Sequence, residues 1–140
     1  MMVDKQVVTE RLRALKTYLA ELDELAQYSL KELTDDFVKY RAAQHSLQLA
    51  AQAIVDIATH IISADYKIQV QDYRHAIEAL GDVGVISTEF ARKIAPLASF
   101  RNILVHEYLA VDPARIHHAL VHGRDDLREF GRQINAYIEE

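Results

Sequence analysis

The sequence has no cysteine and no tryptophan, and its 140 residues include only four glycines and two prolines. The absence of cysteine excludes disulfide bonds, thiolate zinc sites and a cysteine nucleophile. Residues 1–80 contain neither glycine nor proline. Because an all-β fold needs a turn about every 8 to 12 residues, the chain is predicted to be all-α.

The chain also lacks a long apolar run and an excess of positive charge. Charged residues or glutamine interrupt every apolar stretch before it reaches the roughly 18 residues of a membrane span. No uniform apolar signal core follows Met1–Lys5. The 16 basic and 21 acidic residues give a net charge of -5, so any contact with nucleic acid requires a local patch. We therefore expect a soluble, cytoplasmic protein with no membrane partner.

Apolar residues recur at helical spacing along most of the chain. Those in Val3–Tyr28 are spaced by three and four residues and form one stripe. After a polar break at Ser29–Asp36, a second helix is predicted over Phe37–Ser63, with an apolar arc wider than one packed face requires. Such an arc indicates a central helix of a bundle, a subunit interface, or both.

The rest of the chain is predicted from its turn and capping residues. It comprises a loop at Ala64–Gln71, a short helix at Asp72–Leu80, a turn at Gly81–Gly84, a helix from Ser87 to Tyr108 and a last helix from Pro113 to Ile138. Pro96 predicts a kink or a restart near Ala95. Four long helices and one short helix make one compact up-and-down bundle, a single domain over residues 1–140.

Residues 99–108 read SFRNILVHEY and set four polar side chains into an apolar helix. Asn102 and His106 are one turn apart on one face, and Arg101 and Tyr108 nearly coincide in direction. Arg101 and His106 are five residues apart and do not share a face on a straight helix. A second copy of the segment across a two-fold axis would bring them together. On residue type alone, a structural arginine–carboxylate pair and an interior histidine are the stronger interpretation.

The whole string from Arg101 to Tyr108 resembles the signature of the HEPN superfamily, an arginine followed four to six residues later by a histidine. With a tyrosine two residues after the histidine, it resembles the HepT toxin branch. Tyr40–Ala50, Ile54–Ile62 and Ala79–Leu97 are similar to the same branch. The resemblance implies a HEPN-like bundle, a homodimer with both motif helices lining one cleft, and a metal-independent endoribonuclease toxin without a cofactor. Its partner would be an MntA-like nucleotidyltransferase antitoxin.

The resemblance also implies roles for the motif residues, and their chemistry fits. His106 would be the acid or base for RNA cleavage by the neighbouring 2'-hydroxyl, since histidine titrates near neutral pH. Arg101 would bind the charge that develops on the phosphate, and Asn102 would be the positioning residue, which orients the imidazole of His106 or binds a phosphate oxygen. Tyr108 would be the site at which the antitoxin attaches AMP, whose bulk and charge would oppose an RNA substrate. Alternatively, Tyr108 simply caps the end of the bundle.

Other polar clusters are weaker candidates. His118 and His122 have a spacing that can chelate a metal ion, but no third ligand is defined, so no metal site is expected. Three arginines share one face of the last helix, where helix ion pairs are the preferred interpretation over RNA binding; they are Arg124, Arg128 and Arg132. Arg92 and Lys93 are better candidates for RNA binding. The competing functional hypothesis is a non-catalytic helical module that docks to a nucleotidyltransferase.

Overall fold

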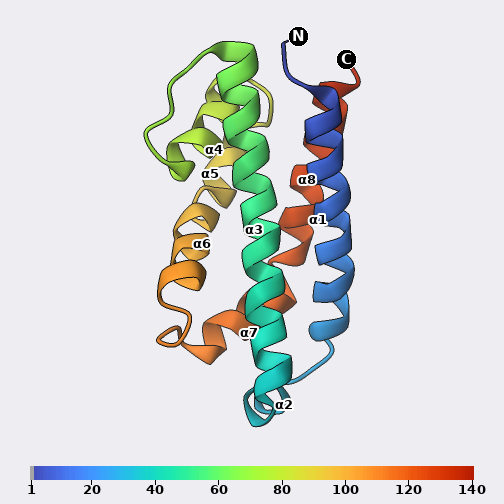
Figure 1. Cartoon of the computed structure of the whole chain (residues 1–140), viewed down its shortest axis with the longest axis vertical. Coiled ribbons are helices and arrows are strands. Elements are labelled where there is room, and N and C mark those ends of the chain that lie inside the picture. Colours follow the sequence, from blue (N-terminus) through green and yellow to red (C-terminus); the bar gives the residue numbers. More distant parts are fainter. Residues whose placement is uncertain (1) are drawn as a thin grey trace.

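Residues 2–140, the part of the chain described by this computed structural model, form eight α-helices and no strand (Figure 1). In chain order the helices are α1 (Lys5–Leu25), α2 (Leu30–Asp35), α3 (Phe37–Tyr66), α4 (Tyr73–Asp82), α5 (Thr88–Ile94), α6 (Leu97–His106), α7 (Pro113–His122) and α8 (Arg124–Ile138). The predicted all-α class is confirmed.

The wide apolar arc of α3 reflects its central position. This 30-residue helix packs against α1, α2, α4, α6 and α7, and it carries buried residues on several sides. Contrary to the expectation from sequence, α3 is long and apolar enough to cross a membrane by length and composition alone. Most of its apolar side chains between Ala43 and Ile62 lie in the core of the bundle, however, whereas Phe37 and Val38 at its start are exposed. A buried central helix passes the same test of length and composition.

Two predicted boundaries move for local reasons. The supposed break at Ser29–Asp36 contains α2, because Ser29 and Glu32 form a reciprocal capping box and Leu33 is fully buried. The second helix also continues past the predicted Ser63 to Tyr66. It ends where Lys67 adopts a left-handed conformation with φ 53°.

The two C-terminal helices of the prediction are each divided. Pro96 separates α5 from α6, which confirms the predicted restart. The last helix was predicted to be continuous, which is wrong, because Gly123 divides it into α7 and α8. A β-carbon at Gly123 would lie 2.6 Å from the carbonyl oxygen of Ala119. The close approach therefore needs glycine, and Arg124 Nε donates to the Leu120 carbonyl, one of the last in α7, at 2.8 Å.

Asp65, near the end of α3, binds both ends of the described chain. The two ends lie at the same end of the bundle (Figure 1). Its carboxylate accepts hydrogen bonds from the backbone N–H groups of Met2 and Val3, each at 2.6 Å, and from the hydroxyl of Tyr137. Burial raises the pKa of Asp65, but the hydrogen bonds from these donors together lower it by a larger amount. The pKa therefore lies below its ordinary value of 3.8. The ionised form is therefore favoured by folding.

Asp65→Asn is expected to lower the free energy of unfolding at pH 7 by about 1–2 kcal/mol, since hydrogen bonds to a charged acceptor are lost. A carboxyl with a depressed folded pKa stabilises the fold above its unfolded pKa, and this contribution disappears as the pH falls through the folded value. The gap between variant and parent, measured by urea unfolding, should therefore close below pH 3.8. Asp35→Asn, at an exposed surface pair with Lys31, is the matched control. A gap that does not narrow as the pH falls below 3.8 would contradict this account.

Candidate active site

The helix α6 restarts after Pro96 and carries three of the four predicted site residues. Ala98 and Leu104 are its buried side chains, and α3 is the helix it packs against most extensively. Asn102 and His106 are both exposed, one turn apart, on the side of α6 away from Leu104. The burial of one face thus leaves the predicted polar face open.

Arg101 lies half-buried between α6, α3 and α4. Its Nε donates to Oε1 of Gln52 at 2.7 Å, and its guanidinium carbon lies 5.1 Å from the ring centroid of Tyr73. A second nitrogen donates to Oδ1 of the neighbouring Asn102 at 2.9 Å. Gln52 in turn donates to Asp56 at 2.7 Å. The guanidinium is therefore fixed from three sides by uncharged groups.

The charge of Arg101 has no direct partner. Within residues 2–140 no carboxylate lies within ion-pair distance of its guanidinium. The structural interpretation considered from the sequence required such a pair. A fixed, half-buried guanidinium without a carboxylate is instead suited to bind a phosphate, because its remaining N–H groups match two phosphate oxygens.

Arg101 and His106 point to different surroundings in one chain. Arg101 reaches toward Gln52 and Tyr73, whereas His106 is the exposed last residue of α6. This separation agrees with their five-residue spacing along the helix. The guanidinium also donates to Asn102, which shares the exposed face of α6 with His106 one turn away.

Tyr108 lies outside the helix, which corrects the predicted helix end and its alignment with Arg101. The helix ends at His106, and Glu107 leaves helical geometry with φ -137°. A turn follows in which Ala110 N–H donates to the Glu107 carbonyl at 2.9 Å. Gln44 of α3 donates to the carbonyl of Tyr108 at 2.7 Å, and the tyrosine side chain remains exposed. The position of Tyr108 is therefore fixed by Gln44 of α3 and not by helical hydrogen bonds of α6.

Three supporting residues, Gln44, Gln52 and Tyr73, were missed from the sequence. The two glutamines belong to a polar row on α3 with one member every four residues, and such a row inside a wide apolar arc is a detectable signal. The row consists of Gln44, Gln48, Gln52 and Asp56. No comparable signal distinguishes Tyr73.

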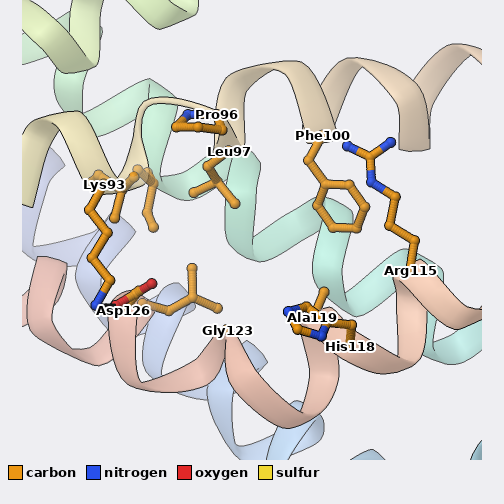
Figure 2. A pocket seen from close by; sticks show the side chains of 12 residues that line it. Lys93, Pro96, Leu97, Phe100, Arg115, His118, Ala119, Gly123 and Asp126 are labelled. Atoms are coloured by element: carbon orange, nitrogen blue, oxygen red, sulfur yellow. Dashed lines mark ion pairs between the residues drawn. The ribbon is translucent and has the colours of Figure 1, made fainter.

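A cavity of about 230 Å³ lies behind α6, between the α5–α6 and α7–α8 segments (Figure 2). Leu97 and Phe100 line it from α6, and Arg115 lies over the Phe100 ring with 5.4 Å between the guanidinium carbon and the ring centroid. Neither Arg101 nor His106 lines it. This cavity is therefore separate from the polar groups of the motif.

The remaining candidates occupy ion pairs or isolated positions. Arg124 and Arg128 both bind Asp23, and Arg132 binds Glu129, which confirms the ion-pair interpretation of the last helix. These hydrogen bonds lower the pKa of Asp23, and the bond from Arg128 has a larger effect than the bond from Arg124.

Lys93 pairs with Asp126 at 3.1 Å, whereas Arg92 is exposed. The His118 and His122 rings lie 4.6 Å apart, and the described residues contain no group of three potential metal ligands.

Comparison with known proteins gives consistent matches over nearly the whole chain. Residues 15–134 match the model of a family described as Ribonuclease HepT-like. The protein named tRNA nuclease HepT from Aphanizomenon flos-aquae (strain 2012/KM1/D3) is 30% identical over 136 residues, which cover 97% of this chain and 92% of that protein.

Solved structures share the fold at lower identity. A tri-AMPylated Shewanella oneidensis HEPN toxin in complex with MNT antitoxin has a TM-score of 0.85 and 20% identity, over 95% of this chain and 99% of that one. YutE of Bacillus subtilis, a cytosolic protein of unknown function, has a TM-score of 0.84 and 22% identity, over 99% and 92%.

Proposed function

We propose, because this chain belongs to the HepT-like ribonuclease family, that it is the toxin of a type VII-like toxin–antitoxin pair and a metal-independent endoribonuclease of the cytoplasm. The observation that carries the proposal is the guanidinium of Arg101, fixed by Gln52 and Tyr73 without a neutralising carboxylate. The similar protein from Aphanizomenon flos-aquae is named a tRNA nuclease, so transfer RNA is the first substrate class to test.

In the proposed reaction the 2'-oxygen of a ribose attacks the adjacent phosphorus while the bond to the 5'-oxygen of the next nucleotide breaks. The products are a 2',3'-cyclic phosphate and a 5'-hydroxyl end. His106 takes the proton from the attacking hydroxyl or gives one to the leaving oxygen. Arg101 binds the oxygens on which negative charge grows, and Asn102, hydrogen-bonded to Arg101, positions the guanidinium. Arg92 and Lys93 are proposed to bind RNA outside this centre.

A homodimer is part of the proposal because Arg101 and His106 are five residues apart on α6, a spacing that does not by itself put both on one face. Two copies with their α6 helices side by side would place the arginine of one near the histidine of the other. The exposed faces of Asn102 and His106 are available for this arrangement. The active cleft is then shared between the copies.

The antitoxin partner is proposed to be an MntA-like nucleotidyltransferase that attaches AMP to Tyr108. The structurally similar Shewanella toxin is described as tri-AMPylated and in complex with an MNT antitoxin. Tyr108 is 44% exposed in the turn directly after the motif helix. An adenylyl group there adds bulk and negative charge beside the proposed RNA site, and both effects disfavour an anionic substrate.

Purified chain should cut RNA in the presence of EDTA and leave cyclic phosphate ends. The test compares initial rates on a mixed transfer RNA pool with and without chelator, followed by analysis of the 3' ends. Equal rates and cyclic ends are expected. Loss of cutting with EDTA would overturn the metal-independent mechanism, and absence of cutting under both conditions would favour a non-catalytic docking module.

Gln52→Met is expected to lower kcat about tenfold, because Arg101 loses the acceptor that fixes its Nε. Arg101 itself remains, so KM should change less than kcat. Gln48→Met, one turn earlier on α3, is the matched control and should keep the parental rate. Equal kcat for the two variants would show that Gln52 does not position the arginine.

A further inference from the structure

Arg41 of α3 is an exposed cation in contact with Tyr108. Its guanidinium carbon lies 5.5 Å from the ring centroid of Tyr108 and 5.5 Å from that of Tyr40. It makes one hydrogen bond, from a terminal nitrogen to Oε1 of Gln44 at 2.8 Å. No carboxylate of residues 2–140 lies within ion-pair distance. Most of its N–H donors are therefore free to bind an anion.

Gln44 holds Arg41 and Tyr108 in a fixed relation. Its amide accepts from Arg41 and donates to the carbonyl of Tyr108 at 2.7 Å. Only 4% of Gln44 is exposed, so breaking either bond leaves a buried polar atom without a partner. The cation thus stays beside the tyrosine although 67 positions separate them in the sequence.

We propose that Arg41 binds the phosphodiester of an AMP group attached to Tyr108; the inference rests on the modification proposed above. The phenol oxygen of Tyr108 attacks the α-phosphorus of ATP, its proton is released, the new O–P bond forms, and pyrophosphate leaves. The ester that remains carries one negative charge directly beyond the ring that Arg41 contacts. A guanidinium with free N–H groups binds two oxygens of such an ester.

Other cations contact different rings. Arg101 also keeps free N–H groups, but its guanidinium lies over the ring of Tyr73, while Lys39 lies over the ring of Tyr28, 4.2 Å from its centroid. Arg41 is therefore the cation with both contact to Tyr108 and donors to spare. Binding of the ester to Arg41 fixes the adenylyl group against α3, beside the motif helix, and shields the phosphorus from hydrolysis.

The test uses full-length chain modified by its cognate nucleotidyltransferase with ATP, with single modification at Tyr108 verified by intact mass and peptide mapping. Parent, Arg41→Gln and Arg41→Lys are compared by ³¹P NMR and by the rate at which a phosphodiesterase removes AMP. For Arg41→Gln we expect the ³¹P signal to move toward that of free AMP-tyrosine and AMP removal to be about tenfold faster. Both measurements for Arg41→Lys should lie between those of the parent and Arg41→Gln, since lysine keeps the charge but cannot bind two oxygens with one planar group.

Arg13→Gln, which removes an exposed arginine from α1, is the matched control and should match the parent in both measurements. Identical ³¹P signals and removal rates for parent and Arg41→Gln would overturn the assignment of Arg41 alone. If Tyr108 gains no adenylyl mass, both the proposed modification and this assignment fail. The two failures are therefore distinguishable.

Discussion

Replacing His106 by alanine is expected to reduce RNA cleavage by about 10²–10⁴-fold, the usual contribution of a positioned general acid or base. Because His106 is exposed at the end of α6, the free energy of unfolding should change by less than about 0.5 kcal/mol. Initial rates on transfer RNA and a thermal melt followed by circular dichroism measure the two effects separately. A large loss of rate with an unchanged melting temperature is a chemical effect and not a folding defect.

The matched control for His106 is His118→Ala, an exposed histidine on α7 outside the proposed centre. It should cleave RNA at the parental rate. Growth provides a second measurement, since induction of the parent chain without antitoxin should arrest cells, whereas His106→Ala should not. If parent and variant are equally toxic or equally harmless, the nuclease function proposed for this chain is wrong, and a docking role becomes the better account.

The second large effect is expected at Arg101, where alanine should lower kcat by about 10²–10³-fold. The guanidinium is permanently charged and fixed by Gln52, so it meets the developing phosphate charge without reorganisation. Lysine at this position should recover only part of the rate, because a point charge cannot bind two oxygens in the same plane. Single-turnover rates on a defined RNA separate this loss from weaker substrate binding. Equal rates for parent and Arg101→Ala would exclude the proposed role.

If the cleft is shared between two copies, the two inactive variants should complement each other. Arg101→Ala and His106→Ala chains, each inactive alone, should regain activity when they are co-expressed with different tags and purified as the mixed dimer. In that dimer one copy supplies the arginine and the other the histidine. No recovery in a verified mixed dimer would show that each copy uses its own pair.

The helical class and the restart at Pro96 follow from local rules. The scarcity of glycine excludes turn-rich folds, and proline lacks the N–H that a continuous helix needs. The break at Gly123 and the short helix α2 were not predicted. They depend on a close approach to Ala119 and on a capping box completed by the burial of Leu33. The capping box is a local signal that Ser29 and Glu32 carry in the sequence, whereas the burial of Leu33 depends on the folded bundle.

The motif residues were selected because the whole string resembled a known signature, whereas their supports required the structure. Periodicity places Asn102 and His106 on one face, as observed. It could not show that Gln52 meets Arg101, because 49 positions separate them. Tyr108 was placed on the helix because nothing in the sequence marks its end at His106. The supporting residues of the site were therefore not predicted mainly because they contact the motif from distant positions in the sequence.

Pro96 and Gly123 line the same cavity, from opposite walls (Figure 2). The helices end or restart at both points, so residues 97–122 are not part of a continuous helix with the segments before and after them and are held to the bundle by side-chain packing, mainly on α3. We therefore expect this segment to behave as its own cooperative unit, whose backbone amides exchange with deuterium together and before those of α1, α3 and α8. The part of the molecule that bears the proposed chemistry would then be the part that opens most easily.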